Sequence, residues 1–354
     1  MRRPPVEPGR AWSSGGRAGV EPRRAASSRQ ERTRAQALAN PASRRKIPRM
    51  SLLAMIKGRR GPSGFGYAST AEEVTEGLDL HGKTILVTGI NSGIGRESAR
   101  VLALRGARIL GAARTRDKAR EACAALHGDP VPLECELSEP ASVRACVREA
   151  ATHGPLDVIL CNAGIMALSQ RTLLHGQELQ FLTNHVGHFI LVTGLLPQLR
   201  DDGRVVMLSS DAHRRTPPEG ICFDDLTLAS GYHPWVAYGQ SKLANLLFAR
   251  ALARRFRGTD RTANAVHPGV IATNLGRHMS TAVRVIMPIA NVLAFKTIPQ
   301  GAATQCYVAT HPSLRQVSGE YFADCNVAKS SRHGQDEAMA ERLWTATEEL
   351  VAGL

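Results

Sequence analysis

Short apolar runs alternate with helical patterns from residue 80 to the C-terminus, and this alternation constrains the fold more than any other feature. Each apolar run predicts a strand and each stretch between runs predicts a helix. The predicted strands are residues 85–87, 108–113, 131–135, 157–161, 204–208 and 263–266. Strands connected through helices lie parallel, and the helices cover both faces of the sheet. We therefore predict an α/β fold with a single doubly wound parallel sheet, in one domain over residues 80–354.

A glycine-rich turn follows the first predicted strand and opens the next helix, through about residue 105. Glycines permit a tight turn and let backbone amides at a helix N-terminus approach a pyrophosphate. The spacing Gly-x-x-x-Gly-x-Gly could belong to an ordinary strand–helix turn, but its place in the first βα unit favours a nucleotide site and a Rossmann-type sheet. The predicted contacts are Thr88, Gly89, Asn91, Ser92, Gly93, Ile94 and Gly95.

The end of the second strand indicates which dinucleotide is bound. An NAD-selective site places a carboxylate near Ala113 to hold the ribose 2′-hydroxyl, and the chain has none before Asp117. Arg114 stands there instead, and a guanidinium matches the geometry of a 2′-phosphate. A surface arginine at a strand end is the alternative. The sequence favours NADP(H) over NAD(H).

Small and polar residues follow three later strands. Asn162-Ala163-Gly164 comes after the fourth strand, Ser209-Ser210 ends the fifth, and His-Pro-Gly-Val-Ile-Ala-Thr at 267–273 closes the sixth. Asn184 is expected to open a helix, where Asn commonly serves as an N-cap. Ligands of open α/β sheets bind at the carboxyl ends of the strands, so these positions predict a site at that edge.

Tyr238 and Lys242 have the i, i+4 spacing that places two side chains on one face of a helix. A phenol with a pKa near 10 is a poor acid–base catalyst at neutral pH. An ammonium group nearby favours the phenolate, so we expect Lys242 to lower the pKa of Tyr238. Such a pair also occurs by chance on solvated helices, and the other motifs must decide its meaning.

The motifs occur in one order: glycine-rich turn, Asn-Ala-Gly, Asn184, Ser-Ser, Tyr-x-x-x-Lys and Pro-Gly-x-x-x-Thr. From about Met50 to the C-terminus the chain resembles the short-chain dehydrogenase/reductase family. Asn-His-Val-Gly-His-Phe at 184–189, Tyr-Gly-Gln-Ser-Lys-Leu-Ala-Asn at 238–245, His-Pro-Gly at 267–269 and Gln-Gly-Ala-Ala at 300–303 resemble its retinol dehydrogenase-like branch. Segments 60–65 and 69–74 resemble still more closely the plant members associated with the chloroplast inner-envelope import machinery.

The resemblance implies a role for each catalytic position. Tyr238 is the general acid/base at the substrate oxygen, and Lys242 lowers its pKa and binds the nicotinamide ribose. Ser210 holds and polarises the carbonyl, and Asn184 continues a proton relay through water to Lys242. Asn162, Ala163, Gly164, Tyr238, Lys242, Pro268, Gly269, Ile271 and Thr273 join the glycine-rich turn and Arg114 as cofactor contacts.

The chain departs from the family pattern in the residues expected to contact adenine. The family usually has an Asp after the third strand, and this chain has Glu136-Leu137. The longer carboxylate of Glu136 can still reach the base. Cys161 replaces the first Asn of the common Asn-Asn-Ala-Gly, while Asn162, Ala163 and Gly164 are retained.

A largely apolar segment at about 275–299 corresponds to the substrate lid of the family. An apolar lid implies a lipophilic aldehyde, ketone or alcohol, because burial of apolar area is favourable. Alternatively, this segment is a helix that packs on the core or on a partner subunit. The second of these arrangements would be compatible with a homo-oligomer. Shallow peripheral contact with a membrane, through Arg277, Arg284 and Lys296, is another alternative.

The net charge of +14 is concentrated near the N-terminus. Residues 1–49 contain twelve Arg and one Lys against three Glu, so they carry +10, and the remainder carries only +4. The folded part lacks a basic stripe with interleaved aromatics, which argues against nucleic acid. Residues 1–49 are expected to be disordered. Three explanations are open for them: upstream sequence before a true start at Met50, an organelle transit peptide, or a basic interaction tail. We favour the start at Met50. Residues 50–79 are expected to be a lead-in segment before the domain.

The seven cysteines are an odd number without a Cys-x-x-Cys pair, which favours buried free thiols in a reducing compartment and no metal site. With no run of 18 apolar residues and no secretory signal, we expect no transmembrane span. We expect a cytoplasmic location, or an organelle if residues 1–49 are a transit peptide.

The sequence therefore predicts an NADP(H)-dependent oxidoreductase that transfers hydride between nicotinamide and a hydrophobic carbonyl/alcohol pair. A redox-sensing scaffold that binds NADP(H) and acts through protein partners is the alternative. The presence of Ser210, Tyr238 and Lys242 together favours catalysis.

Overall fold

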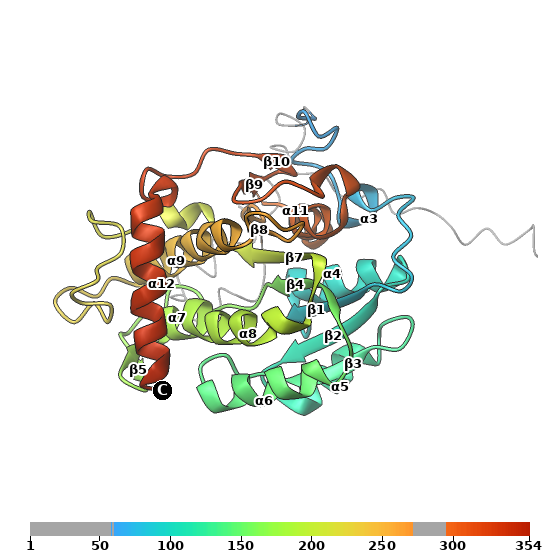
Figure 1. Cartoon of the computed structure of the whole chain (residues 1–354). Coiled ribbons are helices and arrows are strands. Elements are labelled where there is room, and N and C mark those ends of the chain that lie inside the picture. Colours follow the sequence, from blue (N-terminus) through green and yellow to red (C-terminus); the bar gives the residue numbers. More distant parts are fainter. Residues whose placement is uncertain (1–57, 59, 272–294) are drawn as a thin grey trace, which may run out of the picture. The chain divides into compact units, whose positions relative to one another are not determined.

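A computed structural model describes residues 58, 60–271 and 295–354, which belong to one compact unit, Met50–Leu354. The predictions for residues 1–49, for Thr273 and for most of the apolar segment fall outside the described residues. Figure 1 shows the arrangement of the helices and strands.

One sheet of eight strands organises the unit, in the order β10-β9-β8-β7-β4-β1-β2-β3. All neighbouring strands pair in parallel except β9 and β10, which form an antiparallel hairpin. The bounds are β1 Thr84–Thr88, β2 Arg108–Ala113, β3 Val131–Glu134, β4 Leu156–Cys161, β7 Leu199–Leu208, β8 Thr262–His267, β9 Tyr321–Ala323 and β10 Asn326–Val327. A separate hairpin pairs β5 Leu173–Leu174 with β6 Gln177–Glu178. The predicted fold class is confirmed, and the sheet is mostly rather than wholly parallel.

Helices cover both faces of this sheet. The α-helices are α3 Ala71–Val74, α4 Gly93–Leu104, α5 Arg116–Cys123, α6 Pro140–Ala151, α7 Leu179–Phe181, α8 Gly187–Leu195, α9 Pro234–Arg255, α11 Ile298–Thr310 and α12 Glu337–Ala352. Shorter turns are η1 Leu182–Val186, η2 Leu196–Gln198, η3 Asp211–Arg214, η5 Pro312–Leu314 and η6 His333–Gln335. α3, α4 and α11 pack together on one face, and α6, α8, α9 and α12 on the other.

Local sequence explains where the helices near the edge of the sheet begin. α11 starts with a capping box in which Thr297 accepts from the Gln300 amide and Gln300 accepts from the Thr297 amide. α9 and α6 each have Pro at their first position, where a missing N–H costs nothing. α5 is capped by the Thr115 hydroxyl.

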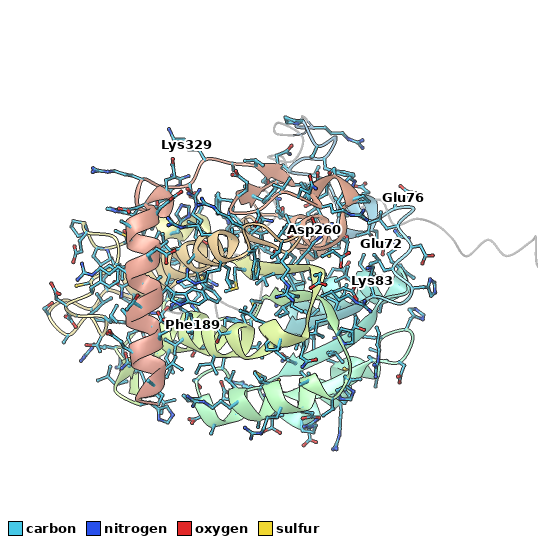
Figure 2. All side chains as sticks on the ribbon, in the orientation of Figure 1. Glu72, Glu76, Lys83, Phe189, Asp260 and Lys329 are labelled. Carbon is cyan, nitrogen blue, oxygen red and sulfur yellow. The ribbon has the colours of Figure 1, made fainter. Side chains whose placement is uncertain are left out.

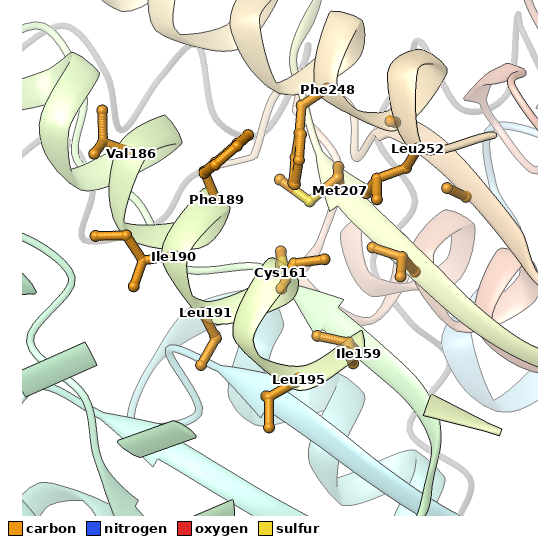
Figure 3. Packing of buried hydrophobic residues seen from close by; sticks show 14 of the residues in the cluster. Ile159, Cys161, Val186, Phe189, Ile190, Leu191, Leu195, Met207, Phe248 and Leu252 are labelled. Carbon is orange, nitrogen blue, oxygen red and sulfur yellow. The ribbon is translucent and has the colours of Figure 1, made fainter. Parts of the chain in front are cut away.

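The core lies in two layers, one on each side of the sheet. In the layer shown in Figure 3, Phe189 on α8 and Phe248 on α9 have ring centroids 5.1 Å apart, and Trp344 on α12 packs against both rings. Of the residues labelled in Figure 2, Phe189 is buried, whereas Glu72, Asp260 and Lys329 are exposed. Helix α12 therefore completes this layer of the core.

One helical run within the described residues, Leu179–Gln198, is long and apolar enough to cross a membrane by length and composition. Within the fold 78% of it is buried, as expected for the core helix of a globular unit. This run is weak evidence for a membrane span.

Candidate active site

The glycine-rich turn lies between β1 and α4, at the carboxyl edge of the sheet. Gly89 has φ +74°, a left-handed conformation that favours glycine, and an added Cβ would lie 3.0 Å from Ala163. A Cβ on Gly95 would collide with Asn162 Nδ2 and the Gly89 carbonyl. The Ser92 side chain makes no capping bond, and α4 has no acidic residue in its first turn. The helix N-terminus thus fits a pyrophosphate, because glycine keeps its backbone accessible.

Thr88 connects this turn to the Asn-Ala-Gly loop after β4. Its hydroxyl oxygen accepts from the amides of Asn162 and Ala163 at 2.9 and 3.0 Å, and its carbonyl accepts from Asn162 Nδ2 at 2.9 Å. The hydroxyl donates to His188 Nε2 at 3.0 Å, since His188 Nδ1 donates to the Asn184 carbonyl at 2.9 Å. The loop is therefore fixed against β1 by bonds that involve no surface residue.

His188 is a site residue that the motif analysis did not assign. It is fully buried, and burial lowers its pKa to about 4, so it stays neutral with the proton on Nδ1. The available signal was its spacing, because His188 lies four residues after Asn184 and therefore on the same helix face.

The expectation that Asn184 opens a helix as an N-cap is wrong. It lies inside η1, a π-helical turn continuous with α7 and α8, and π-turns often occur at functional sites. Its Nδ2 donates to the Ile165 carbonyl and to Ser241 Oγ, both at 2.9 Å, and its Oδ1 accepts from the Ile165 amide at 2.8 Å. The N-cap expectation fails because the preceding residues are helical, so no free amides remain to be capped.

Gly164 brings Asn184 next to Lys242. An added Cβ on Gly164 would lie 2.9 Å from Asn184 Oδ1 and 3.4 Å from Lys242 Nζ. These three positions come from the loop after β4, from η1 and from α9. The fold thus assembles residues that are separated by up to 78 positions in the sequence.

Tyr238 and Lys242 share one face of α9, as their spacing predicts. Lys242 Nζ lies 5.7 Å from the centre of the Tyr238 ring and donates to the Leu208 carbonyl at 2.9 Å. The two side chains are only 6% and 2% exposed. The Tyr-Gly-Gln-Ser-Lys segment is also fixed by Gly239, where a Cβ would collide with the Arg215 carbonyl of the turn after η3.

The protonation of this pair differs from the expectation. Burial raises the pKa of Tyr238 to about 12, although a hydrogen bond with the Ser210 side chain lowers it in part. Burial also lowers the pKa of Lys242 to about 7, while the Cys161 thiol opposes that shift. Desolvation disfavours charge on both groups, and it is the largest cause of both shifts.

Ser209 and Ser210 have different surroundings at the end of β7. The Ser209 hydroxyl is buried and donates to the Lys242 carbonyl at 2.8 Å, so it positions α9. The Ser210 hydroxyl caps η3 by accepting from the Ala212 amide at 3.2 Å, and the same side chain acts to lower the pKa of Tyr238. Ser210 is thus the serine that contacts the phenol.

The residues predicted at the adenosine end lie on the neighbouring strands. Arg114 is exposed just after β2, and within the described residues it makes no hydrogen bond or ion pair. Glu136 Oε1 accepts from the amide and hydroxyl of Ser138, which closes a turn. The Leu137 side chain is buried, and its carbonyl packs against Gly187.

The 268–271 loop follows β8 at the same edge. Pro268, Gly269 and Ile271 are half-buried, and Gly269 has φ +90°. The amide of Asp211, next to Ser210, donates to His267 Nδ1 at 3.1 Å. The loop therefore lies beside Ser210, whereas Thr273 is outside the described residues.

A surface cavity of about 480 Å³ lies elsewhere and is lined by residues of the α9 C-terminus and the start of β8, among them Arg250, Arg257 and Thr262. The start of β8 is at the amino edge of the parallel strands, opposite the motifs. Among the described residues no group of three His, Cys, Asp or Glu side chains could hold a metal ion.

Known proteins are similar to this chain over most of its length. The sequence model for short chain dehydrogenases matches residues 83–223. "Short-chain dehydrogenase TIC 32 A, chloroplastic" of Brassica napus is 42% identical over 320 residues, which are 86% of this chain and 100% of that protein. "Retinol dehydrogenase 14" of Homo sapiens is 38% identical over 77% of this chain and 87% of its own length.

A solved structure has the same fold. A putative uncharacterized protein from Mycobacterium paratuberculosis superimposes with a TM-score of 0.65 at 35% identity, covering 79% of this chain and 97% of that one. The resemblance seen in the motif order is confirmed by these similarities. The chain belongs to the short-chain dehydrogenase/reductase family of oxidoreductases, whose members bind NAD(H) or NADP(H).

Proposed function

We propose that the protein is an NADP(H)-dependent oxidoreductase that interconverts a hydrophobic aldehyde or ketone and its alcohol. The observation that carries this proposal is the joint placement of Ser210, Tyr238 and Lys242 beside the glycine-rich turn. The Ser210 side chain acts on the pKa of the phenol, and Gly164 lies against Lys242. A dinucleotide that lies across this edge would meet a pyrophosphate site and a proton donor together.

The tight turn before α4 needs glycine, because a Cβ at Gly89 or Gly95 would meet the neighbouring Asn162-Ala163 loop. Gly89 and Gly95 would hold the pyrophosphate against the start of α4, and the 268–271 loop would orient the carboxamide. When bound, a nicotinamide cofactor supplies or accepts the hydride. During carbonyl reduction Ser210 would hold the substrate oxygen and the Tyr238 hydroxyl would donate its proton to that oxygen.

Lys242 supports this proton transfer by responding to charge. A neutral Tyr238 is the correct form for donation, and its raised pKa keeps it protonated. Lys242 has a pKa of about 7, so it can gain a proton when negative charge develops at the phenol oxygen. Asn184, held near Lys242 by Ile165, is placed to continue a proton relay through water.

The preference for NADP(H) over NAD(H) rests on Arg114. It is exposed and without a protein partner among the described residues, and no carboxylate stands near Ala113 to hold a ribose 2′-hydroxyl. An unpaired guanidinium at this strand end suits a 2′-phosphate. The proposed adenine contacts are Glu136 and Leu137.

The substrate class is proposed from two observations. The segment at about 275–299 is apolar, and human retinol dehydrogenase 14 is similar over 77% of the chain. Together they support a lipophilic aldehyde, such as a retinoid or a long aliphatic one. A homo-oligomer is compatible with the same apolar segment. Peripheral membrane contact is compatible with it through Arg277 and Arg284 but not through Lys296, which the fold buries.

The test is oxidation of NADPH by the purified protein with a panel of aliphatic and retinoid aldehydes, and with Tyr238→Phe as the control. We expect turnover by the wild type and a decrease in kcat of at least about 100-fold in Tyr238→Phe, with NADPH still bound. Absence of both binding and turnover would exclude the enzyme. Tight NADPH binding without turnover, with recovery of a stable partner, would favour the redox-sensing scaffold.

Residues 1–49 leave the location open between the cytoplasm and an organelle. The Brassica relative is described as chloroplastic, which supports a transit peptide as one explanation of the Arg-rich segment. We still favour a start at Met50. The N-terminal mass of the native protein distinguishes a start at Met50 from an extension that is cleaved or retained.

A further inference from the structure

Lys296 is a buried cation that neither the motifs nor the proposed catalytic groups account for. It is 2% exposed, and its Nζ lies 2.6 Å from Asp324 Oδ1. The geometry is that of an ion pair rather than of a directed hydrogen bond. The ammonium also lies 4.9 Å from the centre of the Tyr67 ring. A buried ammonium is costly unless it is paired, so its presence here calls for a reason.

The side chain of Lys296 packs directly on the loop that follows β8. A Cβ on Gly269 would lie 2.6 Å from Cδ and 2.9 Å from Cε of Lys296. The Lys296 amide donates to the Val270 carbonyl at 2.9 Å, and Ile271 forms a parallel bridge with Lys296. Lys296 thus contacts every residue from Gly269 to Ile271, through its aliphatic chain or its backbone.

The same loop is held between the two halves of the proposed site. On one side the Asp211 amide, next to Ser210, bonds His267. On the other side, Ile271 packs close to Ile94 of the glycine-rich turn. Both side chains lie against Gly301, where an added Cβ would collide with Ile271 Cδ1 and lie 2.9 Å from Ile94 Cγ2. A shift of the loop would therefore change its place relative to both the catalytic serine and the cofactor turn.

Asp324 is itself held in an uncommon conformation. It has φ +51° and Cys325 has φ +61°, in the turn between β9 and β10. Non-glycine residues adopt this conformation at a cost that surrounding contacts must offset. Here the Cys325 amide donates to Thr304 Oγ1 at 3.2 Å, and Asn326 Nδ2 donates to the Asp324 carbonyl at 2.7 Å. The turn thus presents the Asp324 carboxylate to Lys296 from a fixed position.

We propose that Lys296, held by Asp324, is a positioning residue that fixes the backbone of the 268–271 loop against the nicotinamide end of the cofactor. This inference rests on the proposed function, which gives that loop the nicotinamide contact. The Lys296–Asp324 ion pair, which lies outside the catalytic residues, then determines how precisely the hydride donor is aligned with Ser210.

The test compares two ligands that share the adenosine end. NADPH reaches the 268–271 loop, whereas adenosine 2′,5′-bisphosphate carries only the end near Arg114. In Lys296→Met we expect the Kd for NADPH to rise about tenfold, as for the loss of one hydrogen bond. The Kd for the bisphosphate should not change. In turnover, kcat should decrease about tenfold or more with little change in the substrate KM.

Further variants separate positioning from stability. Lys296→Arg keeps the charge and should recover most of the NADPH affinity. Asp324→Asn leaves Lys296 buried and unpaired, so its melting temperature should drop, and Lys296→Met/Asp324→Asn should regain that stability. If the ion pair positions the loop, the double variant still binds NADPH weakly. If its affinity and kcat return with stability, the inference is wrong.

Two outcomes distinguish failure of this inference from failure of the proposed function. Wild-type protein that binds neither ligand would overturn both proposals. Wild-type protein that binds and turns over NADPH, with Lys296→Met and Lys296→Arg unchanged, would overturn only the role of Lys296. Lys329→Met, which removes an exposed lysine, should behave as wild type. If Lys296→Met does not fold, Gly269→Ala disturbs the same loop from the other side and should show the same difference between the two ligands.

Discussion

The ammonium of Lys242 lies 5.7 Å from the ring centre of Tyr238, and both side chains are almost completely buried. Their common environment raises the pKa of the phenol to about 12 and lowers that of the amine to about 7. The pair is therefore close to a state in which neither group is charged. Negative charge that develops near the phenol would therefore favour protonation of Lys242, whose pKa is close to neutral pH.

The buried amine makes stability depend on pH. The unfolded Lys242 has a pKa near 10.5, and the folded one about 7, so between these values the unfolded chain binds more protons. Stability should therefore rise with pH over this window, by up to about 1.4 kcal/mol per pH unit. Urea unfolding at pH 7, 8 and 9 should show this rise in the wild type and a smaller one in Lys242→Met. Parallel curves for the two proteins would contradict the lowered pKa.

Arg114 should determine the choice between the two dinucleotides. Arg114→Ala removes the proposed partner of the 2′-phosphate, and a hydrogen bond to a charged group contributes about 1.5–3 kcal/mol. We expect the Kd for NADPH to rise about 10- to 100-fold, with little change for NADH. Arg120→Ala on α5, the helix that follows Arg114, is the control, because that side chain is also exposed. An equal loss for both dinucleotides would rule out this role.

His188 should stabilise the site through its two hydrogen bonds. His188→Ala leaves the Thr88 hydroxyl and the Asn184 carbonyl without this partner and opens a cavity, at a cost of about 3 kcal/mol. Chemical denaturation measures the loss, and His127→Ala, at an exposed position, serves as control. A change below about 1 kcal/mol would show that the network is not needed.

The lowered pKa of His188 also predicts an acid effect. Folded His188 has a pKa of about 4 against 6.5 when unfolded, so in this window the unfolded chain binds the additional proton. Stability contributed by the neutral ring is present above pH 6.5 and is lost as the pH falls toward 4. His188→Ala should reduce this acid sensitivity, measured by melting temperatures between pH 7 and pH 4.5.

Gly95 should tolerate no side chain. In Gly95→Ala the Cβ would collide with the Gly89 carbonyl, a backbone atom that cannot move without opening the turn. We expect loss of NADPH binding and a destabilisation of about 1–3 kcal/mol. Gly231→Ala, where nothing lies within 4 Å of the added Cβ, is the control and should bind NADPH normally. Normal binding by Gly95→Ala would contradict the close approach.

The sequence by itself determined the strands that build the site. The six predicted strands correspond to β1, β2, β3, β4, the second half of β7 and β8, because apolar runs long enough to cross a sheet interior have few alternatives. β5, β6, β9 and β10 were missed, since strands of two or three residues carry no periodic signal. The motif order also predicted Tyr238, Lys242 and Ser210 as site residues, since glycine, acid–base and turn residues have fixed chemistry wherever they are brought together.

Only the tertiary structure decided the environment of those residues. The π-turn at Asn184, the hydrogen bonds of His188 and the ion pair of Lys296 with Asp324 join segments that are distant in the sequence. The direction of each pKa shift was also decided there. Spacing along α9 places Lys242 near Tyr238, but whether attraction or desolvation dominates depends on how much water the rest of the fold excludes.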